Sequence, residues 1–412
     1  MKRVVVTGVG IISSLGDNIP QFWENIKNGK HGISKLERFD TTDYGTKVAG
    51  EIKDFAPTKY GIDFREAKRM DLFTQYALAC AKMAIEDAGT DFKDVDPFRV
   101  GVMVSTGIGG MDTVINEEHK KQARGVRRVS PYFIPMMIPN IAPGTIAIEY
   151  GFKGTNFSLS SACATSAHSI GEAYRHIKHG YEDVMITGGS ESSILELAVA
   201  GFENMKALTA EVDPNKASVP FDKNRSGFVM SEGAGVLVLE ELEHAKKRNA
   251  KIYGEIVGYG ATDDAYHITC PDLEGTASAK AMEKAMEEAK VSPNEISYIN
   301  AHGTSTPIND RVETLVIKKA LGDAAYKTPI SSSKSMTGHM LGAAGAVESI
   351  VSLLAIRDGI LPPTAGYSIP DPECDLDYIT EGARKADVRI ALSNSLGFGG
   401  HNATLCFKRM ED

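Results

Sequence analysis

Short runs of β-branched and other apolar residues alternate with longer amphipathic stretches along almost the whole chain. The short runs predict buried strands and the long stretches predict helices, and this alternation is typical of α/β proteins whose sheets are covered by helices. Strands are expected at residues 3–7, 100–105, 156–159, 184–187, 235–240, 252–259, 296–300, 329–332, 389–393 and 403–408. Helices are expected at residues 73–88, 164–179, 277–289, 310–321 and 343–357.

The two halves of the chain resemble each other weakly. A strand that runs into a turn and then a helix occurs around Cys163, and again around His302 and Lys334. The charged segment 241–251 is expected to be helical and to join the halves, and no long Pro/Ser-rich linker separates independent domains. We therefore expect two fused halves, residues 1–250 and residues 251–412.

The charge and the cysteine pattern exclude several classes of protein. Acidic residues outnumber basic ones by 54 to 45, which argues against a general nucleic-acid binder. No segment approaches the ~18 apolar residues that a membrane span needs, so no membrane insertion is expected. The five scattered cysteines form no CxxC pair, which disfavours a disulfide framework or a metal site and favours a reducing cytoplasm.

Basic residues gather in two places on this acidic chain. Residues 110–128 are expected to form a charged loop, and a second basic cluster lies upstream. A basic cluster of this kind most often forms a solvent-exposed face, but two such clusters on an acidic chain also suggest an acidic partner. The clusters contain Arg65, Lys68, Arg69, Lys120, Lys121, Arg124, Arg127 and Arg128.

Cys163 stands between an expected strand and an expected helix, among small residues that leave room for a substrate carbonyl. At the first turn of a helix, free N–H groups and the helix dipole favour an anion, so the pKa of this thiol is expected to fall. The alternative is a small buried cysteine with a purely structural role.

His302 and the hydroxyls of Thr304 and Thr306 follow another expected strand, at the sheet edge where open α/β sheets bind ligands. For the threonines, turn formation and helix capping, with Asp310 as the cap, is nearly as good an explanation.

Two glycine-rich turns complete the set. Lys334 and His339 lie in one of them, and Glu348 on the next helix could pair with the lysine. Phosphate binding is an alternative for this turn, but its spacing does not match GxxxxGK[ST]. In the other turn, glycines flank Phe398 and let backbone N–H groups point inward, where they could stabilise an oxyanion; the alternative is a plain tight turn.

The segment 7–16, Thr-Gly-Val-Gly-Ile-Ile-Ser-Ser-Leu-Gly, is similar to a dinucleotide-binding loop. It fails the GxGxxG pattern because Ser13 replaces the third glycine. We interpret it as a first strand and turn, which disfavours a dehydrogenase.

In this order, Ala-Cys-Ala-Thr, Asn-Ala-His-Gly-Thr-Ser-Thr-Pro, Lys-Ser-Met-Thr-Gly-His and Gly-Phe-Gly-Gly resemble the β-ketoacyl synthases of the thiolase-like superfamily, over essentially the whole chain. The resemblance implies a homodimer, with two pseudo-symmetric βαβαβαββ halves in five α-β-α-β-α layers. It implies fatty-acid elongation by decarboxylative condensation of malonyl-acyl carrier protein with an acyl group on Cys163. No metal or organic cofactor is implied, since phosphopantetheine arrives on the acyl carrier protein. Asn309 favours the type 2 branch.

The resemblance also implies a role for particular residues. The first half would carry the nucleophile and the second half the two catalytic histidines. The implied catalytic set is the nucleophile Cys163, the histidines His302 and His339, the supporting pair Lys334 and Glu348, and the gate Phe398, whose N–H joins that of Cys163 in an oxyanion hole. The implied substrate contacts are Thr304, Thr306, Phe202 and Gly399. The implied carrier-docking residues are Arg65, Lys68, Arg69, Arg124, Arg127, Arg128 and Lys206.

Three alternatives stay open. A polyketide-type ketosynthase shares the same triad and differs in substrate. A thiolase needs a second cysteine near the C-terminus, where this chain has Phe398 and His401. A non-catalytic partner subunit would have lost Cys163. Leu396 and His401 depart from part of the family beside the gate, so no acyl-chain length is carried over.

Overall fold

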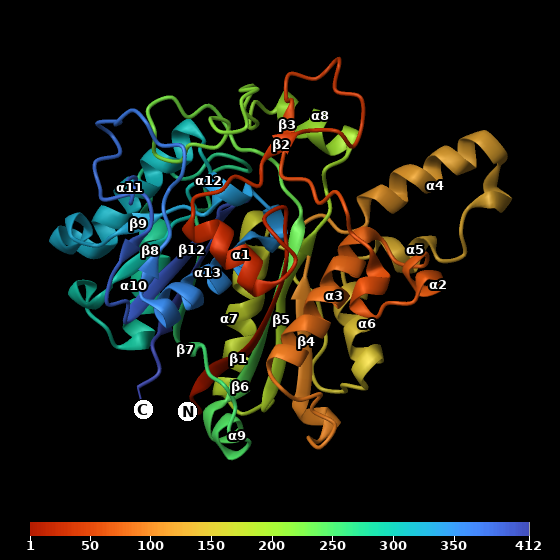
Figure 1. The fold of residues 1–412 in the computed structure, drawn as a ribbon, viewed down its shortest axis with the longest axis horizontal. Helices are drawn as coiled ribbons and strands as arrows, with labels where there is room; N and C mark the ends of the chain where they lie inside the picture. Colours follow the sequence, from red (N-terminus) through yellow and green to blue (C-terminus); the bar gives the residue numbers. More distant parts are fainter. Residues whose placement is uncertain (412) are drawn as a thin grey trace.

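The computed structural model describes residues 1–411, in which one nine-stranded sheet runs in the order β4-β5-β6-β1-β7-β13-β12-β8-β9 (Figure 1). Two short ribbons, β2 with β3 and β10 with β11, lie outside it. The strands are β1 (Val4–Ile12), β2 (Ser34–Lys35), β3 (Val48–Ala49), β4 (Val100–Ser105), β5 (Val184–Glu191), β6 (Gly233–Glu241), β7 (Gly254–Asp263), β8 (Tyr298–Asn300), β9 (Ile330–Ser331), β10 (Ile360–Leu361), β11 (Arg384–Lys385), β12 (Ile390–Gly397) and β13 (His401–Lys408).

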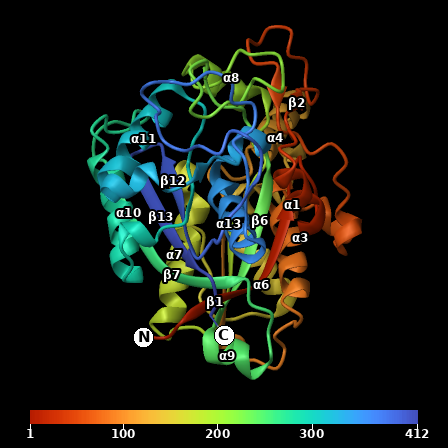
Figure 2. The ribbon, with the colours of Figure 1, turned by 60° about the vertical axis from the view of Figure 1, so that its left-hand side comes forward.

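Helices α7 and α13 pack against each other and against strands of both halves, whereas α3 and α6 cover one outer face and α10 and α11 the other (Figures 1 and 2). The two sides of the sheet form two β layers with α7 and α13 between them, so the chain has the five α-β-α-β-α layers of the thiolase-like fold. The helices are α1 (Ile19–Lys27), α2 (Phe64–Ala67), α3 (Leu72–Asp87), α4 (Met111–Arg124), α5 (Phe133–Met137), α6 (Ile141–Tyr150), α7 (Thr165–Lys178), α8 (Glu196–Asn204), α9 (Leu242–Lys247), α10 (Thr276–Ala289), α11 (Pro307–Leu321), α12 (Lys334–Thr337) and α13 (Ala344–Asp358).

The strands follow the same order on both sides of the sheet's centre when each is matched with its counterpart in the other half of the chain. One side runs β1-β6-β5-β4 and the other runs β7-β13-β12-β8. The two sides meet where β1 pairs antiparallel with β7. The element order β7-α10-β8-α11-β9-α13-β12-β13 repeats the order of the first half, in which a single bridge at Asn156 takes the place of the third strand.

Glycines in the two central strands let each strand lie directly on an outer helix. A Cβ on Gly8 or Gly10 of β1 would lie 2.1 Å from a carbonyl oxygen of α3. On Gly258 or Gly260 of β7 it would lie 2.0 or 1.8 Å from a carbonyl oxygen of α10. The glycines that resembled a nucleotide loop therefore serve helix packing. The expected first strand and turn are confirmed, because β1 continues to Ile12 and a turn over Ser13–Gly16 follows, in which the N–H groups of Ser13 and Gly16 each donate to the other's carbonyl.

Side chains along β6 alternate between two apolar layers, as a strand buried on both faces requires. Val236 and Val238 belong to the cluster around α3, whereas Leu237 and Leu239 belong to the cluster around α7 and α13. Each fully buried side chain of this kind contributes about 1.5–3 kcal/mol. The central layer holds the helix that begins beside Cys163, so this packing fixes the position of the site.

Most expected elements are confirmed, with ends shifted by a few residues, and two are wrong. In 156–159 only Asn156 bridges to Val102, because the N–H of Leu159 donates to the Ser105 hydroxyl rather than to a neighbouring strand. The expected loop 110–128 contains the helix α4, which has glycines at both ends and lysine–glutamate pairs three residues apart. Within residues 1–411 no helix has the length and apolar character to cross a membrane.

Candidate active site

Cys163 lies in a 3₁₀ turn, Ala162–Ala164, that leads directly into α7. Ala162 has φ of 50°, a left-handed conformation that is uncommon for alanine. The N–H of Ala164 donates to the Ser161 carbonyl at 3.1 Å, and the N–H of Ser161 donates to the Thr165 hydroxyl at 2.9 Å. These bonds hold the cysteine at the N-terminal end of the helix.

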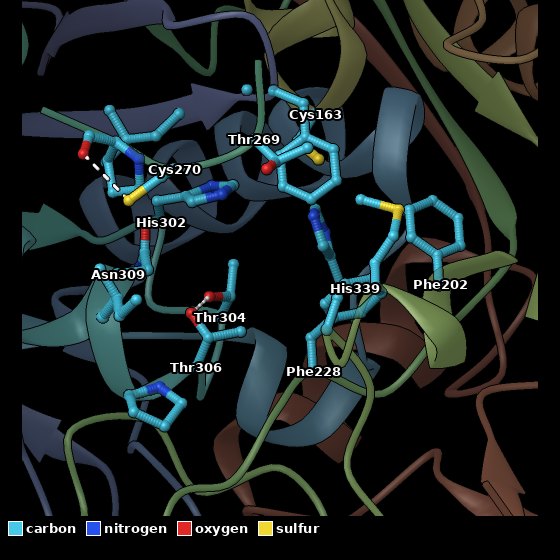
Figure 3. Close-up of a pocket in the computed structure, with 18 of the residues that line it drawn as sticks. Cys163, Phe202, Phe228, Thr269, Cys270, His302, Thr304, Thr306, Asn309 and His339 are labelled. Atoms are coloured by element: carbon cyan, nitrogen blue, oxygen red, sulfur yellow. Dashed lines mark hydrogen bonds between the residues drawn. The ribbon is translucent and has the colours of Figure 1, made fainter. Parts of the chain in front are cut away.

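The cavity in front of Cys163 has a volume of about 400 Å³ (Figure 3). The side chains of Cys163, His302 and His339 come together on one side of it, and Thr304 and Thr306 lie farther away. The structure thus brings together residues from distant parts of the sequence. The predicted residues that line the cavity are Cys163, Phe202, Lys206, His302, Thr304, Thr306, His339 and Phe398.

The two histidine rings face each other edge to face, with centroids 5.3 Å apart and planes at 86°. The ring of Phe228 packs in the same way on His339, at 5.2 Å. Burial, reinforced by the charge of Lys334, lowers the pKa of both His302 and His339 well below the ordinary value. Both imidazoles are therefore neutral at physiological pH.

Lys334 lies behind the histidines and does not line the cavity. Its ammonium group pairs with Glu348 and lies 3.3 Å from Nδ1 of His302. Because an ammonium group only donates, Nδ1 accepts and the ring proton of His302 is on Nε2. Burial raises the pKa of Glu348 to about 7, and the charge of Lys334 opposes that rise. The pair therefore fixes the histidine as a hydrogen-bond donor.

Glu313 on α11 was missed by the sequence analysis. Its carboxylate accepts the backbone N–H groups of His302 and Gly303, both at 2.7 Å, and so fixes the loop that carries the histidine. Burial raises its pKa to about 7. Also missed were Phe228 and the loop of Thr269 and Cys270, which line the cavity. Nothing in their local patterns marks them, since they join the site only through the fold.

The expected fall in the pKa of Cys163 is wrong. Burial raises the pKa of the thiol to about 12, and this exceeds the opposing effects of the Lys334 charge and of a hydrogen bond from the Phe398 backbone. The sequence predicts the helix N-terminus, but it does not show that Cys163 is buried, with only 8% of its surface exposed. The thiol is therefore protonated at neutral pH and must lose its proton during the reaction.

Phe398 lies in the tight turn between β12 and β13. Its ring is 6.4 Å from that of Phe202, and its backbone N–H hydrogen-bonds to Cys163. Gly397 packs so closely on the Cys163 turn that a Cβ there would lie 2.5 Å from the Ser161 carbonyl. Gly399 does not line the cavity, and its N–H donates to the Ile268 carbonyl at 2.8 Å.

The hydroxyls of Thr304 and Thr306 lie 3.0 Å apart on the cavity wall. Thr306 precedes α11, but its side chain makes no capping bond. Asp310 is not the cap of this helix; it accepts the N–H groups of Ser305 and Phe221 instead. Helix capping therefore does not explain the threonines.

The seven basic residues expected to dock a carrier are all exposed, and none forms an ion pair within residues 1–411. Lys206 lines the cavity. Of the others, three lie on or just after α2 and three lie at or just after the end of α4, which projects from the body of the molecule (Figure 1). The guanidinium of Arg69 stacks on Tyr132 at 4.9 Å, so the segment that follows α2 contacts the segment that follows α4.

Comparisons with known proteins agree with this geometry. Residues 1–245 match the family model described as Beta-ketoacyl synthase, N-terminal domain, and residues 253–368 match Beta-ketoacyl synthase, C-terminal domain. The chain is 49% identical over 410 residues to the 3-oxoacyl-[acyl-carrier-protein] synthase 2 of Staphylococcus aureus, covering 100% of this chain and 99% of that one. It is 47% identical over 411 residues to the protein of the same name from Synechocystis, with the same coverage.

Solved structures give the same result. A beta-ketoacyl synthase from Burkholderia phymatum superposes with a TM-score of 0.91 at 34% identity, over 100% of both chains. A ketosynthase in complex with a type II PKS acyl-carrier protein superposes with a TM-score of 0.92 at 34% identity, over 99% of this chain and 100% of that one.

The fold, the cysteine at a helix start and the facing histidines thus define a condensing enzyme of the acyltransferase class. The chain belongs to the beta-ketoacyl synthase family.

Proposed function

We propose that this enzyme elongates fatty acids by condensing malonyl-acyl carrier protein with an acyl group held on Cys163, giving 3-oxoacyl-acyl carrier protein and CO2. The observation that carries the proposal is the convergence of Cys163 with the neutral His302 and His339 in one cavity. We propose that neither a metal nor an organic cofactor takes part, since phosphopantetheine arrives on the carrier.

In the first half-reaction the Cys163 sulfur attacks the carrier thioester. The acyl group moves to Cys163, the bond to the pantetheine sulfur breaks, and the thiol proton ends on that sulfur. This covalent step divides one difficult condensation into two easier ones. Thr304 and Thr306, whose hydroxyls hydrogen-bond to each other on the cavity wall, would present their remaining hydrogen-bonding capacity to the amides of the pantetheine arm.

In the second half-reaction a malonyl thioester loses CO2 and leaves an enolate. His302, with its proton on Nε2, and His339 donate to the enolate oxygen, and preorganised donors of this kind contribute on the order of 3 kcal/mol each. The enolate carbon attacks the acyl-Cys163 carbonyl, whose oxyanion accepts the N–H groups of Cys163 and Phe398. The C–S bond then breaks, and the released sulfur takes up a proton.

We propose acyl carrier protein as the partner because its acidic surface would meet seven exposed cations that form no ion pair within residues 1–411. Lys206 lies at the cavity, three lie on or just after α2, and three lie at or just after the end of the projecting α4. Charges at the rim of an interface act mainly on the association rate. Reversing Arg127 and Arg128 to Glu should raise the KM for the carrier at low salt and leave kcat unchanged. The matched control reverses Lys246 and Lys247 on α9, at the far end of the molecule from α8 (Figure 1). An unchanged KM in the first variant would contradict the docking proposal.

We propose a homodimer, with the face formed by α5, α6 and the segment beside β4 as the interface. Ile134, Ile148 and Phe157 are 57%, 82% and 39% exposed there, and β4 is the edge strand of the sheet. Exposed apolar patches at a sheet edge are typical of protein interfaces. We further propose that residues 1–250 and 251–412 are the two functional halves and that the enzyme works in the cytoplasm.

Two alternatives are separated by product analysis. A polyketide-type ketosynthase would use the same residues, but the 34% identity to such an enzyme is lower than the 49% to 3-oxoacyl-[acyl-carrier-protein] synthase 2. A thiolase needs a second cysteine in the loop near the C-terminus, where this chain has Phe398 and His401, and Cys406 is 0% exposed within β13.

The test supplies acyl carrier and malonyl carrier together and measures CO2 and the mass of the product. We expect one CO2 per product and a 3-oxoacyl chain two carbons longer than the acyl substrate. His302→Ala should lose CO2 release. Product formed without CO2, or from two acetyl units, would contradict the proposal.

A further inference from the structure

The carboxylate of Glu191, at the end of β5, is fully buried and has no part in the chemistry described above. Its Oε1 accepts the hydroxyls of Thr106 at 3.1 Å and Ser193 at 3.0 Å. Its Oε2 accepts the backbone N–H groups of Gly107 and Gly342, both at 3.0 Å. Glu191 therefore ties the segment after β4, in the first half, to the turn before α13, in the second half.

The turn before α13, Leu341–Ala343, is the counterpart of the Cys163 turn in the repeated fold. Both are 3₁₀ turns that begin with a left-handed residue, Ala162 at φ 50° and Leu341 at φ 47°, and both lead into a central helix. By this correspondence Gly342 takes the place of Cys163. Its N–H, at the start of a helix, favours an anion, and the carboxylate of Glu191 is that anion.

The fit around this carboxylate leaves no space for a side chain. A Cβ on Gly342 would lie 2.3 Å from the backbone nitrogen of Gly107 and 2.7 Å from Oε2 of Glu191. A Cβ on Gly107 would lie 2.8 Å from the same oxygen. The two backbone segments approach this closely because both residues are glycines.

Both tied segments continue to the surroundings of Cys163. The carbonyl of Gly107 accepts the hydroxyl of Ser160, three residues before the nucleophile, at 3.1 Å. Leu341 belongs to the same apolar cluster as Cys163 and Phe228. A fatty acyl chain on Cys163 needs apolar walls of this kind, because burial of its methylene groups provides the binding free energy.

His339 is held separately, although it lies close to the same turn in the sequence. Its backbone N–H donates to the Val229 carbonyl at 2.8 Å, and its carbonyl accepts the N–H of Ser231 at 2.9 Å. Loss of the Glu191 bonds therefore should not displace this histidine.

We propose that Glu191 is a positioning residue for acyl transfer, whose carboxylate holds the Gly107 and Leu341–Ala343 segments as walls beside the acylated Cys163. This inference rests on the proposed function. It separates the two half-reactions, because acyl transfer depends on these walls, whereas malonyl decarboxylation depends on the histidines.

The test compares Glu191→Ala and Glu191→Gln with the wild-type protein. Two rates are measured: acyl transfer to Cys163 from a long-chain acyl carrier, by intact-protein mass, and CO2 release from malonyl carrier. We expect Glu191→Ala to slow acyl transfer about 10-fold or more, as loss of a supporting hydrogen-bond partner commonly does, and to change decarboxylation by less than about twofold.

Glu191→Gln should restore most of the acyl transfer. Its amide oxygen still accepts both N–H groups, and its NH2 faces the hydroxyls of Thr106 and Ser193, which can rotate to accept. The matched control is Glu240→Gln, which alters a buried carboxylate at the other end of the β5–β6 pair, and it should change neither rate. If both rates fall in proportion in Glu191→Ala, or if neither falls, the inference is overturned.

A second readout covers the case in which Glu191→Ala does not fold. Gly342→Ala perturbs the same contacts from the other side, because its Cβ would lie 2.7 Å from Oε2 of Glu191, and it should slow acyl transfer more than decarboxylation. Equal changes in the two rates would overturn the assignment. Wild-type protein that takes up no acyl mass would overturn the proposed function instead, so the two failures are distinguishable.

Discussion

The Cys163 turn and the Leu341–Ala343 turn have the same backbone conformation, but one lies beside a cavity and the other is fully packed. Both begin with a left-handed residue and open into a central helix. In the first, the N–H of Cys163 lies beside a cavity of about 400 Å³. In the second, the equivalent N–H of Gly342 donates to Glu191, and no space remains. The repeated fold thus supplies two anion-binding turns, and only one of them faces a substrate cavity.

The contrast between the two turns separates what the fold provides from what the site adds. The fold provides an N–H group at a helix start, which favours negative charge in both turns. The site adds a thiol, two neutral histidines and the N–H of Phe398, which hydrogen-bonds to that thiol. A carboxylate fills the second turn permanently, whereas the first is available to a transient oxyanion.

The largest expected effect comes from making the active turn resemble its inactive counterpart. Cys163→Ala should lower condensation by about 10⁴-fold or more, in line with the loss of a nucleophile in other enzymes. The free energy of unfolding should change little, because only one buried atom is removed. Steady-state condensation and thermal unfolding are the measurements. Activity above about a tenth of the wild-type rate would show that the two turns do not differ in the way described.

The next effect concerns the two histidines, whose side chains line the cavity beside Cys163. His302→Ala should slow CO2 release from malonyl carrier by about 10²–10³-fold, because it removes a preorganised donor to the enolate. Acyl transfer to Cys163 should fall much less. Decarboxylation and acylation are measured separately on the same preparation. Equal losses in the two assays would argue against a role confined to the malonyl step.

A smaller effect is expected from a methyl group in the inactive turn. Gly342→Ala places a Cβ 2.3 Å from a backbone nitrogen, so it should destabilise the protein by about 1–3 kcal/mol. Denaturant unfolding gives the value. The matched control is Gly201→Ala on α8, where a Cβ meets nothing within 4 Å. Equal stabilities of the two variants would refute the close packing described between Glu191, Gly107 and Gly342.

The last effect is a pH dependence. The pKa of Cys163 is raised to about 12, so the thiolate fraction grows about tenfold for each pH unit below that value. Between pH 7 and pH 9 the rate of iodoacetamide reaction at Cys163 should therefore rise about tenfold per unit. Cys163→Ala supplies the background from the other cysteines. A plateau below pH 8 would mean that the helix start outweighs burial.

The sequence was sufficient for most strands and helices and for Cys163, His302 and His339, which meet in the cavity, and the family resemblance implied the five layers. Alternation of buried and amphipathic stretches located the elements, and His302, His339 and Lys334 stood out because each follows a strand. The charged helix α4 was mistaken for a loop because few apolar residues mark its inner face. The pKa of Cys163 could not be predicted, because it depends on burial by segments distant in the sequence. Glu191 and Glu313 lie within ordinary strand and helix patterns, and only the folded chain shows which N–H groups they accept.

The proposed reaction depends above all on Cys163 as the acyl acceptor. The direct measurement incubates the protein with acyl carrier alone, digests it and locates the added mass by peptide sequencing. We predict one acyl group per chain, on the peptide that contains Cys163, released by hydroxylamine as a thioester and absent from Cys163→Ala. An acyl thioester that persists in Cys163→Ala, or that maps to Cys270 or Cys406, would contradict the account.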